Sequence, residues 1–323
     1  KLDMVFFADG VAVRAEDNPE GALSRDMKNA ELEPLTLLAA LGACTNNIGL
    51  VSTASTTYNE PFHIARKFAS IDHISKGRAG WNVVTSWSKH EAWNFNREQH
   101  LGADERYERA AEFVEVVAGL WDGWEPDAFI RDKASGQFYN PEKMPVLDHK
   151  GKHLPGGGPL NSARTPQQRP IIVQAGASEA GRDIAARTAD VIYTNAFKLD
   201  AAQAYYTDMK ERAKRYGRSP DDILVMPGVT FYVGRTREEA QAKLDQLQDL
   251  IHPLTGLSML YSYVGDLSGH DLDGPVPEPT DPKILSIGQN LLDLARKDNL
   301  TIRELYKTIA AGGAGRYIVG TAE

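Results

Sequence analysis

The sequence has a single cysteine, Cys44, among its 323 residues. This excludes an internal disulfide and any metal site built from several cysteines, and Cys44 itself is expected at a buried helix end. Apolar runs long enough for a membrane-spanning helix, about 20 residues, are also missing. Acidic residues outnumber basic ones, which gives a net charge of -8. Because nucleic acids and anionic membranes bind basic surfaces, neither is expected as a partner. Since the sequence shows neither a membrane-spanning run nor a charged-then-apolar signal segment, we expect a cytoplasmic protein.

What the sequence has instead is an alternation of short apolar runs with segments of helical periodicity. The runs are Met4 to Ala8, Ile48 to Ala54, Trp81 to Thr85, Ile171 to Gln174, Val191 to Thr194 and Ile223 to Val233. This alternation is typical of strand and helix units around a parallel sheet, so we predict an α/β fold. Pro34 and Pro61 suit the first turn of a helix, and Thr236 with Glu239 matches a capping box. The strongest helix prediction covers residues 104–122.

Two stretches break this alternation. Residues 125–169 and 252–283 carry proline, glycine and mixed charge. Long loops inside a compact domain are usually lids, binding loops or disordered insertions. We therefore predict a single domain over residues 1–323 with two insertions.

Reacting groups in a parallel barrel lie where strands end and loops begin. The residues at these ends are Asp9, Ser52, Thr53, Thr85, Ser86, Gln174, Gly176, Ser178, Thr194 and Asn195. They include no lysine and no cluster of His, Asp and Glu, which disfavours Schiff-base chemistry and metal-assisted hydrolysis. Hydroxyls, amides and one carboxylate orient a ligand but perform little chemistry alone. The reactive group is therefore predicted to be a cofactor.

The segment from Gln174 to Arg182 passes from a strand through small residues into a helix. The first N–H groups of that helix, together with the Ser178 hydroxyl, are suited to bind a phosphate. Ser178 is equally suited to be an N-cap, and Asp9 to brace a loop, so both interpretations stay open. His100 is a candidate to reach the strand-end pocket.

Several longer strings are particular enough to identify a family. They are Tyr58 to His73, Gly77 to Ser86, Glu91 to Phe95, Asp104 to Ala110, Gly158 to Asn161, Gln174 to Ser178 and Ile251 to Pro253. In these strings the sequence closely resembles the nitrilotriacetate monooxygenase family. This group of flavin-dependent oxygenases lies within the bacterial-luciferase superfamily, and the resemblance covers nearly the whole chain.

The resemblance implies a luciferase-like (β/α)8 TIM barrel that uses FMN as FMNH2, supplied by a separate NAD(P)H-dependent flavin reductase. Carried over by position, the flavin site includes Asp9, Thr53, Tyr107 and Ser178. The family often has a histidine where this chain has Ala103, and His100 is the candidate to replace it. A homodimer is also implied, as is the expectation that the first and last barrel strands are missing from residues 1–323.

The implied activity is that of a two-component monooxygenase. Oxygen adds to reduced flavin, and the resulting flavin hydroperoxide inserts one oxygen atom into a small organic substrate such as an aminopolycarboxylate, a sulfone or an alkane. Because a hydroperoxide decays when water reaches it, a closing lid is implied as well, and the insertion at 252–283 is the candidate lid. The resemblance does not select one substrate. Two alternatives stay open: a flavin-binding barrel relative with lost or reduced catalysis, and a phosphate-binding barrel enzyme without flavin.

Overall fold

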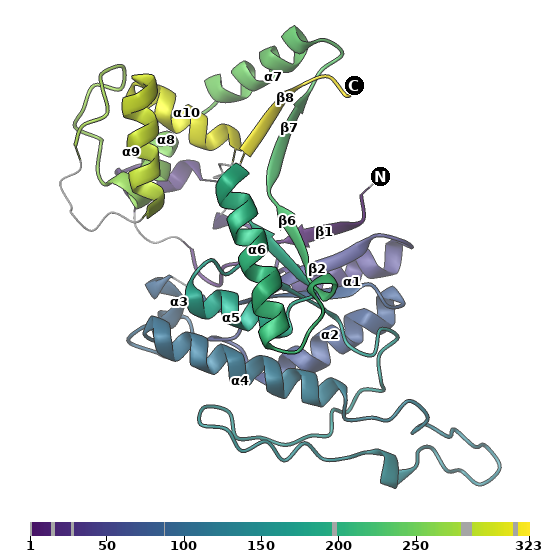
Figure 1. Ribbon diagram of the computed structural model, residues 1–323. Coiled ribbons are helices and arrows are strands. Elements are labelled where there is room, and N and C mark those ends of the chain that lie inside the picture. Colours follow the sequence, from purple (N-terminus) through teal and green to yellow (C-terminus); the bar gives the residue numbers. More distant parts are fainter. Residues whose placement is uncertain are drawn as a thin grey trace. The chain divides into compact units, whose positions relative to one another are not determined.

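The computed structural model describes residues 2–13, 17–26, 29–86, 88–195, 199–278, 286–312 and 316–323. The chain divides into two compact units (Figure 1). The first unit comprises Lys1–Ala12, Leu32–Thr194 and Gln203–Met226, and the second comprises Val13–Glu31, Asn195–Ala202 and Pro227–Glu323. Each is described by itself, and the single barrel domain over residues 1–323 stays a prediction.

A six-stranded sheet with its strands in chain order organises the first unit. Its strands are β1 (Met4–Phe7), β2 (Gly49–Ser55), β3 (Ala79–Val84), β4 (Ile171–Gln174), β5 (Val191–Thr194) and β6 (Leu224–Pro227). Pairing is parallel from β1 to β5. The α/β prediction is therefore confirmed as a parallel sheet curled as a half-barrel, whereas the closed eight-stranded barrel and its missing strands stay predictions.

Helices follow the strands β1 to β5, as the alternation predicted, whereas the short helix after β3 was not predicted. They are α1 (Pro34–Cys44), α2 (Pro61–Ser75), α3 (Lys89–Trp93), α4 (Ala103–Trp121), α5 (Glu179–Thr188) and α6 (Leu199–Arg215). Pro34 and Pro61 do begin their helices, where the missing N–H has no intrahelical partner to lose. Cys44 does end a helix but is exposed, so its predicted burial is wrong. Gly42 belongs to the buried face of α1, and a residue two positions later points to the other side of a helix.

The core of the first unit lies between the sheet and these helices. Trp81 of β3 is fully buried and its ring packs 5.9 Å from both Phe68 and Phe113. Its indole Nε1 donates to the Ala54 carbonyl at 3.0 Å, so the one polar atom of the side chain is satisfied. This core holds the strands whose ends form the candidate site.

The predicted excursion at residues 125–169 contains one short 3₁₀ helix, Pro141–Lys143, and isolated bridges. Glu112 of α4 holds part of it, because its carboxylate accepts from the backbone N–H groups of His153 and Leu154 at 2.9 and 2.7 Å. A long segment without regular structure is thus tied to a helix of the core.

The described residues of the second unit form a parallel strand pair, four α-helices and the short 3₁₀ helix Leu23–Arg25. The strands and α-helices are β7 (Val229–Val233), α7 (Arg237–Asp249), α8 (Pro253–Val264), α9 (Ser286–Asp298), α10 (Ile302–Gly312) and β8 (Arg316–Gly320). Strands β7 and β8 lie side by side (Figure 1). Leu260, Ile302, Leu305 and Tyr306 lie in its core, which α8, α9 and α10 form.

Three predictions in this region need correction. The run Ile223 to Val233 is not one strand, because Pro227, which lacks a backbone N–H, ends β6 and the chain enters a different sheet as β7. Helix α8 occupies residues 253–264 of the predicted second insertion; its N-cap, His252, accepts from the Leu254 N–H at 3.2 Å. At α7, Thr236 caps as predicted, but Glu239 accepts from the Arg235 N–H rather than from that of Thr236.

The candidate lid at 252–283 stays a prediction, since residues 279–285 lie outside the described part of the chain. No helix among the described residues is long and apolar enough to cross a membrane.

Candidate functional site

A cavity of about 320 Å³ opens at the carboxyl ends of β1 to β4 in the first unit. Three of the four predicted site residues line it, namely Asp9 after β1, Thr53 in β2 and Tyr107 in α4. The segment Gln174–Gly176 after β4 forms another wall. The volume is within the range of small-molecule and cofactor pockets, about 300–1,000 Å³.

Thr53 and Asn82 are opposed residues of β2 and β3, and both face the cavity. The Asn82 amide donates from Nδ2 to the Thr53 hydroxyl at 2.8 Å, while its Oδ1 is buried and has no hydrogen-bond partner among the described residues. Whichever way the amide is turned, one of its two polar atoms lacks a hydrogen-bond partner among the described residues. Because a buried unpaired polar group is costly, this atom indicates a ligand that the cavity is built to take.

Glu91 brings a second unpaired acceptor to the same wall. It lies on the short helix α3, is only 5% exposed, and its Oε1 accepts from the Val11 N–H at 3.2 Å. Asn94, just after α3, donates to the Val11 carbonyl at 2.9 Å. The two side chains therefore hold both backbone polar groups of Val11, which itself lines the cavity. Glu91 Oε2 is buried and has no hydrogen-bond partner in the part of the chain that the structure describes.

Ser86 continues the wall beyond β3 and adopts a positive φ of 56°. Its hydroxyl lies 2.7 Å from that of Ser55, and its carbonyl accepts from Nη1 of Arg106. A non-glycine residue in this conformation needs support from its surroundings. Arg106 of α4 gives that support from behind the cavity.

His100 lies behind Ser86, connected to it through Arg106. Its Nε2 is 2.9 Å from Arg106 Nη1 and its Nδ1 is 2.5 Å from the Tyr58 hydroxyl. Guanidinium only donates, so Nε2 accepts and the ring proton of the neutral imidazole is on Nδ1. Burial, and then the charge of Arg106, hold the pKa of His100 below its ordinary value. His100 thus contacts the backbone of Ser86, which lines the cavity, but is not itself among the described lining residues.

Ser178 is placed differently from the other three predicted residues. It caps α5, and its Oγ accepts from the Gly181 N–H at 3.2 Å. The described lining of the cavity reaches Gly176, two residues before it. The N-cap interpretation is therefore confirmed, and the phosphate role of Ser178 stays a prediction.

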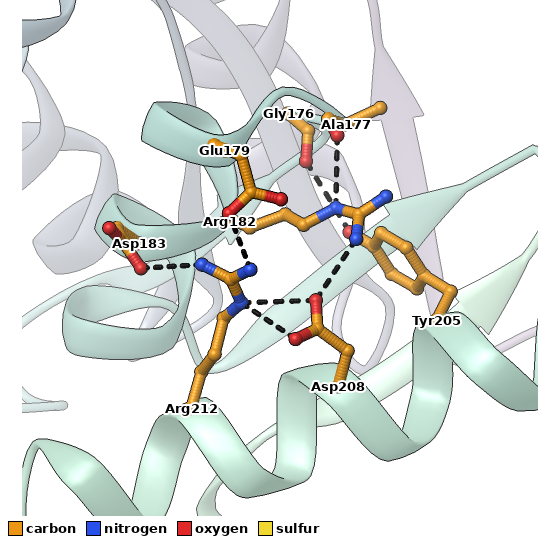
Figure 2. A network of polar contacts seen from close by, with 8 residues as sticks. All are labelled: Gly176, Ala177, Glu179, Arg182, Asp183, Tyr205, Asp208 and Arg212. Atoms are coloured by element: carbon orange, nitrogen blue, oxygen red, sulfur yellow. Dashed lines mark hydrogen bonds and ion pairs between the residues drawn. The ribbon is translucent and has the colours of Figure 1, made fainter.

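The loop between β4 and α5 is held by side chains of α5 and α6 (Figure 2). Arg182 donates to the Ala177 carbonyl at 2.9 Å, and the Tyr205 hydroxyl donates to the Gly176 carbonyl at 3.4 Å. The Arg182 guanidinium also lies over the Tyr205 ring, 5.0 Å from its centroid. Side chains of α5 and α6 therefore fix this wall of the cavity.

Asn82 and Glu91 were not among the residues predicted for this site. Asn82 had a usable signal, because a polar amide inside the apolar run of β3 needs a partner when buried. Glu91 had none, since only the tertiary fold brings α3 against the loop after β1. Among the described residues, no group of three or more His, Cys, Asp and Glu side chains could hold a metal ion.

Comparison with known proteins gives a consistent result. The family model of the luciferase-like monooxygenases matches residues 8–306. The chain is 50% identical over 328 residues to N-acetyl-S-(2-succino)cysteine monooxygenase of Bacillus subtilis (strain 168), covering 100% of this chain and 73% of that protein. It is 46% identical over 330 residues to nitrilotriacetate monooxygenase component A of Aminobacter aminovorans, covering 99% and 73%.

A solved structure of riboflavin lyase, with modified FMN and riboflavin, superposes with a TM-score of 0.80 at 32% identity and covers 99% of this chain and 71% of that one. The resemblance seen in the sequence strings is confirmed by these matches, and the relatives from Bacillus subtilis and Aminobacter aminovorans are both monooxygenases. The chain belongs to the luciferase-like monooxygenase family.

Proposed function

We propose that this protein is the oxygenase component of a two-component, FMNH2-dependent monooxygenase that inserts one oxygen atom into a small organic substrate. The observation that carries the proposal is the cavity at the strand ends, whose wall holds two buried acceptors without partners, in a member of this family. The alternative of a phosphate-binding barrel enzyme without flavin has no comparable support.

The residues of the cavity fit a flavin. Its ring system carries N–H donors and its ribityl chain carries hydroxyl donors, and Asn82 and Glu91 each offer an acceptor that no other described residue pairs with. Apolar contact comes from Ala8, Val83 and Ala175 in the same wall. Asp9, Thr53 and Tyr107 would hold the ring system and ribityl chain, and Ser178 with the first N–H groups of α5 would hold the phosphate.

When bound, reduced flavin supplies the electrons with which O2 is activated. The protein's own contribution is to bind and orient, because Thr53, Asn82 and Glu91 occupy rigid places on β2, β3 and α3. Their burial keeps water from competing for the same hydrogen bonds. Such a preformed polar wall loses little entropy when a ligand binds.

A separate flavin reductase is the partner that this proposal requires. One relative is itself named component A of its monooxygenase, which supports a second protein that delivers the reduced cofactor. We propose an NAD(P)H-dependent reductase in that role and a homodimer as the state of the oxygenase. The two relatives named above act on nitrilotriacetate and N-acetyl-S-(2-succino)cysteine, so a substrate panel begins with these two compounds.

The test combines purified protein, a flavin reductase, NADH, FMN and each compound of the panel under ¹⁸O2. Incorporation of one labelled oxygen atom into a product supports the proposal, and a parallel FMN titration reports binding alone. Binding of FMN without any product over a wide panel supports the relative with lost catalysis. Absence of FMN binding contradicts both.

A further inference from the structure

We propose that the polar network between α5 and α6 is a positioning device that prepares the loop between β4 and α5 for the phosphate of the cofactor. The network consists of Glu179, Arg182, Asp183, Tyr205, Asp208 and Arg212 (Figure 2). None of these residues lines the cavity described above. The inference rests on the proposed function, because it names the residues that set the anion-binding end of the same site.

The first argument concerns the direction of two peptide groups. The carbonyls of Gly176 and Ala177 both accept hydrogen bonds from the network, from Tyr205 and Arg182 respectively. Both peptide bonds are trans, and in a trans peptide the N–H points opposite to the C=O. Fixing the two carbonyls toward the network therefore turns the N–H groups of Ala177 and Ser178 the other way. The loop therefore has two N–H donors that point away from Tyr205 and Arg182.

These two donors add to those of the helix itself. The first N–H groups of a helix have no intrahelical acceptor, and at α5 the Ser178 hydroxyl takes only that of Gly181. A phosphate at this end of α5 would meet several N–H groups and the positive end of the helix dipole.

The second argument concerns charge. Glu179 and Asp183 lie in the first two turns of α5, where carboxylates stabilise the helix but repel an anionic ligand. Arg212 of α6 donates to Glu179 at 2.6 Å and to Asp183 at 2.7 Å, and its Nε lies 2.8 Å from Asp208. The hydrogen bond to Glu179 is the largest cause of the raised pKa of Arg212, so the guanidinium stays charged. Arg212 thus draws both carboxylates of α5 toward α6.

Asp208 couples the two halves of the network. It accepts from Arg212 and, at 3.0 Å, from Arg182, so the group that neutralises the carboxylates is tied to the group that orients the Ala177 carbonyl. Arg212 is only 8% exposed, and charge-assisted hydrogen bonds of this geometry are the strong ones. Loss of Arg212 should therefore free two carboxylates and loosen Arg182 together.

A network that merely fastens α5 to α6 would predict something different. In that case its loss would weaken the binding of all flavins alike, or would lower only the stability of the protein. A positioning role for the phosphate predicts a selective effect, because riboflavin has the same ring and ribityl chain as FMN but no phosphate. The ratio of the two affinities separates these roles.

The experiment measures the dissociation constants of FMN and riboflavin by flavin fluorescence for the full chain and three variants. For Arg212→Met we expect FMN affinity to fall about tenfold, the size of a favourable helix-dipole and charge contribution, while riboflavin affinity changes less than about twofold. Tyr205→Phe removes one neutral hydrogen bond and should lower FMN affinity about threefold, again selectively. The control is Arg303→Met, which breaks a comparable pair with Asp273 in the second unit and should move neither constant.

Equal losses of FMN and riboflavin affinity in folded Arg212→Met and Tyr205→Phe proteins would overturn the inference, as would no change in either. If Arg212→Met does not fold, Tyr205→Phe alone decides by the same ratio. Failure of the unaltered protein to bind FMN contradicts the proposed function instead, so the two failures are distinguishable.

Discussion

Replacing Thr53 by valine and Asn82 by leucine together should give a protein that is more stable without ligand yet binds flavin poorly. Each substitution keeps nearly the volume and shape of the original side chain. The pair removes the 2.8 Å hydrogen bond between the two residues and also the buried amide oxygen that has no partner. Stability and binding are therefore expected to change in opposite directions, which is typical of a residue retained for function.

The expected size follows from these two terms. An unpaired buried polar atom costs about 1–3 kcal/mol, and the lost hydrogen bond contributed about 0.5–1.5 kcal/mol, so the net gain in the free energy of unfolding is about 1 kcal/mol. In a chain of this size that corresponds to a rise of about 2 °C in the melting midpoint. Asn82→Leu alone should gain less, because it leaves the buried Thr53 hydroxyl without its partner.

The assay is a thermal melt of the ligand-free protein beside an FMN titration. Thr188→Val is the matched control, since it also removes a threonine hydroxyl with one hydrogen bond, to the Ile184 carbonyl, outside this cavity. It should leave FMN affinity unchanged. A double variant that melts several degrees lower, or that binds FMN as tightly as before, would refute the reasoning about the unpaired acceptor.

Three further predictions concern the same wall. Glu91→Gln keeps an acceptor for the Val11 N–H but loses the charge of the unpaired oxygen. The melting midpoint should therefore stay the same, while the affinity for FMN or for substrate falls about fivefold, the range for a hydrogen bond to a charged group. Unchanged affinities for both would contradict a ligand role. Gly176→Ala should destabilise the fold by about 1–3 kcal/mol in urea unfolding, because a Cβ there would lie 2.9 Å from the Gly181 Cα. Gly10→Ala serves as its control, since a Cβ at Gly10 meets nothing within 4 Å. Equal losses of stability in the two variants would contradict this packing argument. Burial and Arg106 hold the pKa of His100 below about 6.5, so the unfolded chain takes up that proton first. The stability contributed by the neutral ring is full above about pH 6.5 and is lost as pH falls toward the folded pKa. Urea unfolding between about pH 7 and about pH 5 should therefore show a steeper loss in the original protein than in His100→Gln, and parallel curves would argue against a buried neutral ring.

Local patterns predicted the elements of the first unit because their causes are local. Apolar runs and first-turn prolines determine where β4 or α2 begins, and neither depends on distant residues. Strand-end position alone placed Asp9 and Thr53 at the cavity, since the carboxyl ends of parallel strands meet at one edge.

What escaped prediction depends on contacts between distant segments. Glu91 reaches the cavity because α3 packs on the loop after β1, 80 positions earlier in the chain. The run Ile223 to Val233 looked continuous because the change of sheet at Pro227 leaves the apolar pattern intact. The proline-containing start of the predicted second insertion hid α8, in which Pro253 occupies a first-turn position rather than breaking a helix.

The loops that build the cavity share one construction. The loop after β1 is held through Val11 by α3, the end of β3 through Ser86 by Arg106 of α4, and the loop after β4 by Arg182 and Tyr205. In each case side chains of a helix bind the loop's backbone carbonyls or N–H groups. Side chains and N–H groups on the cavity side are thereby left available, and their positions are fixed before any ligand arrives. A rigid site avoids the entropy cost of ordering loops upon binding. The free energy that the unpaired acceptors cost in the ligand-free protein is offset when a ligand donates hydrogen bonds to them.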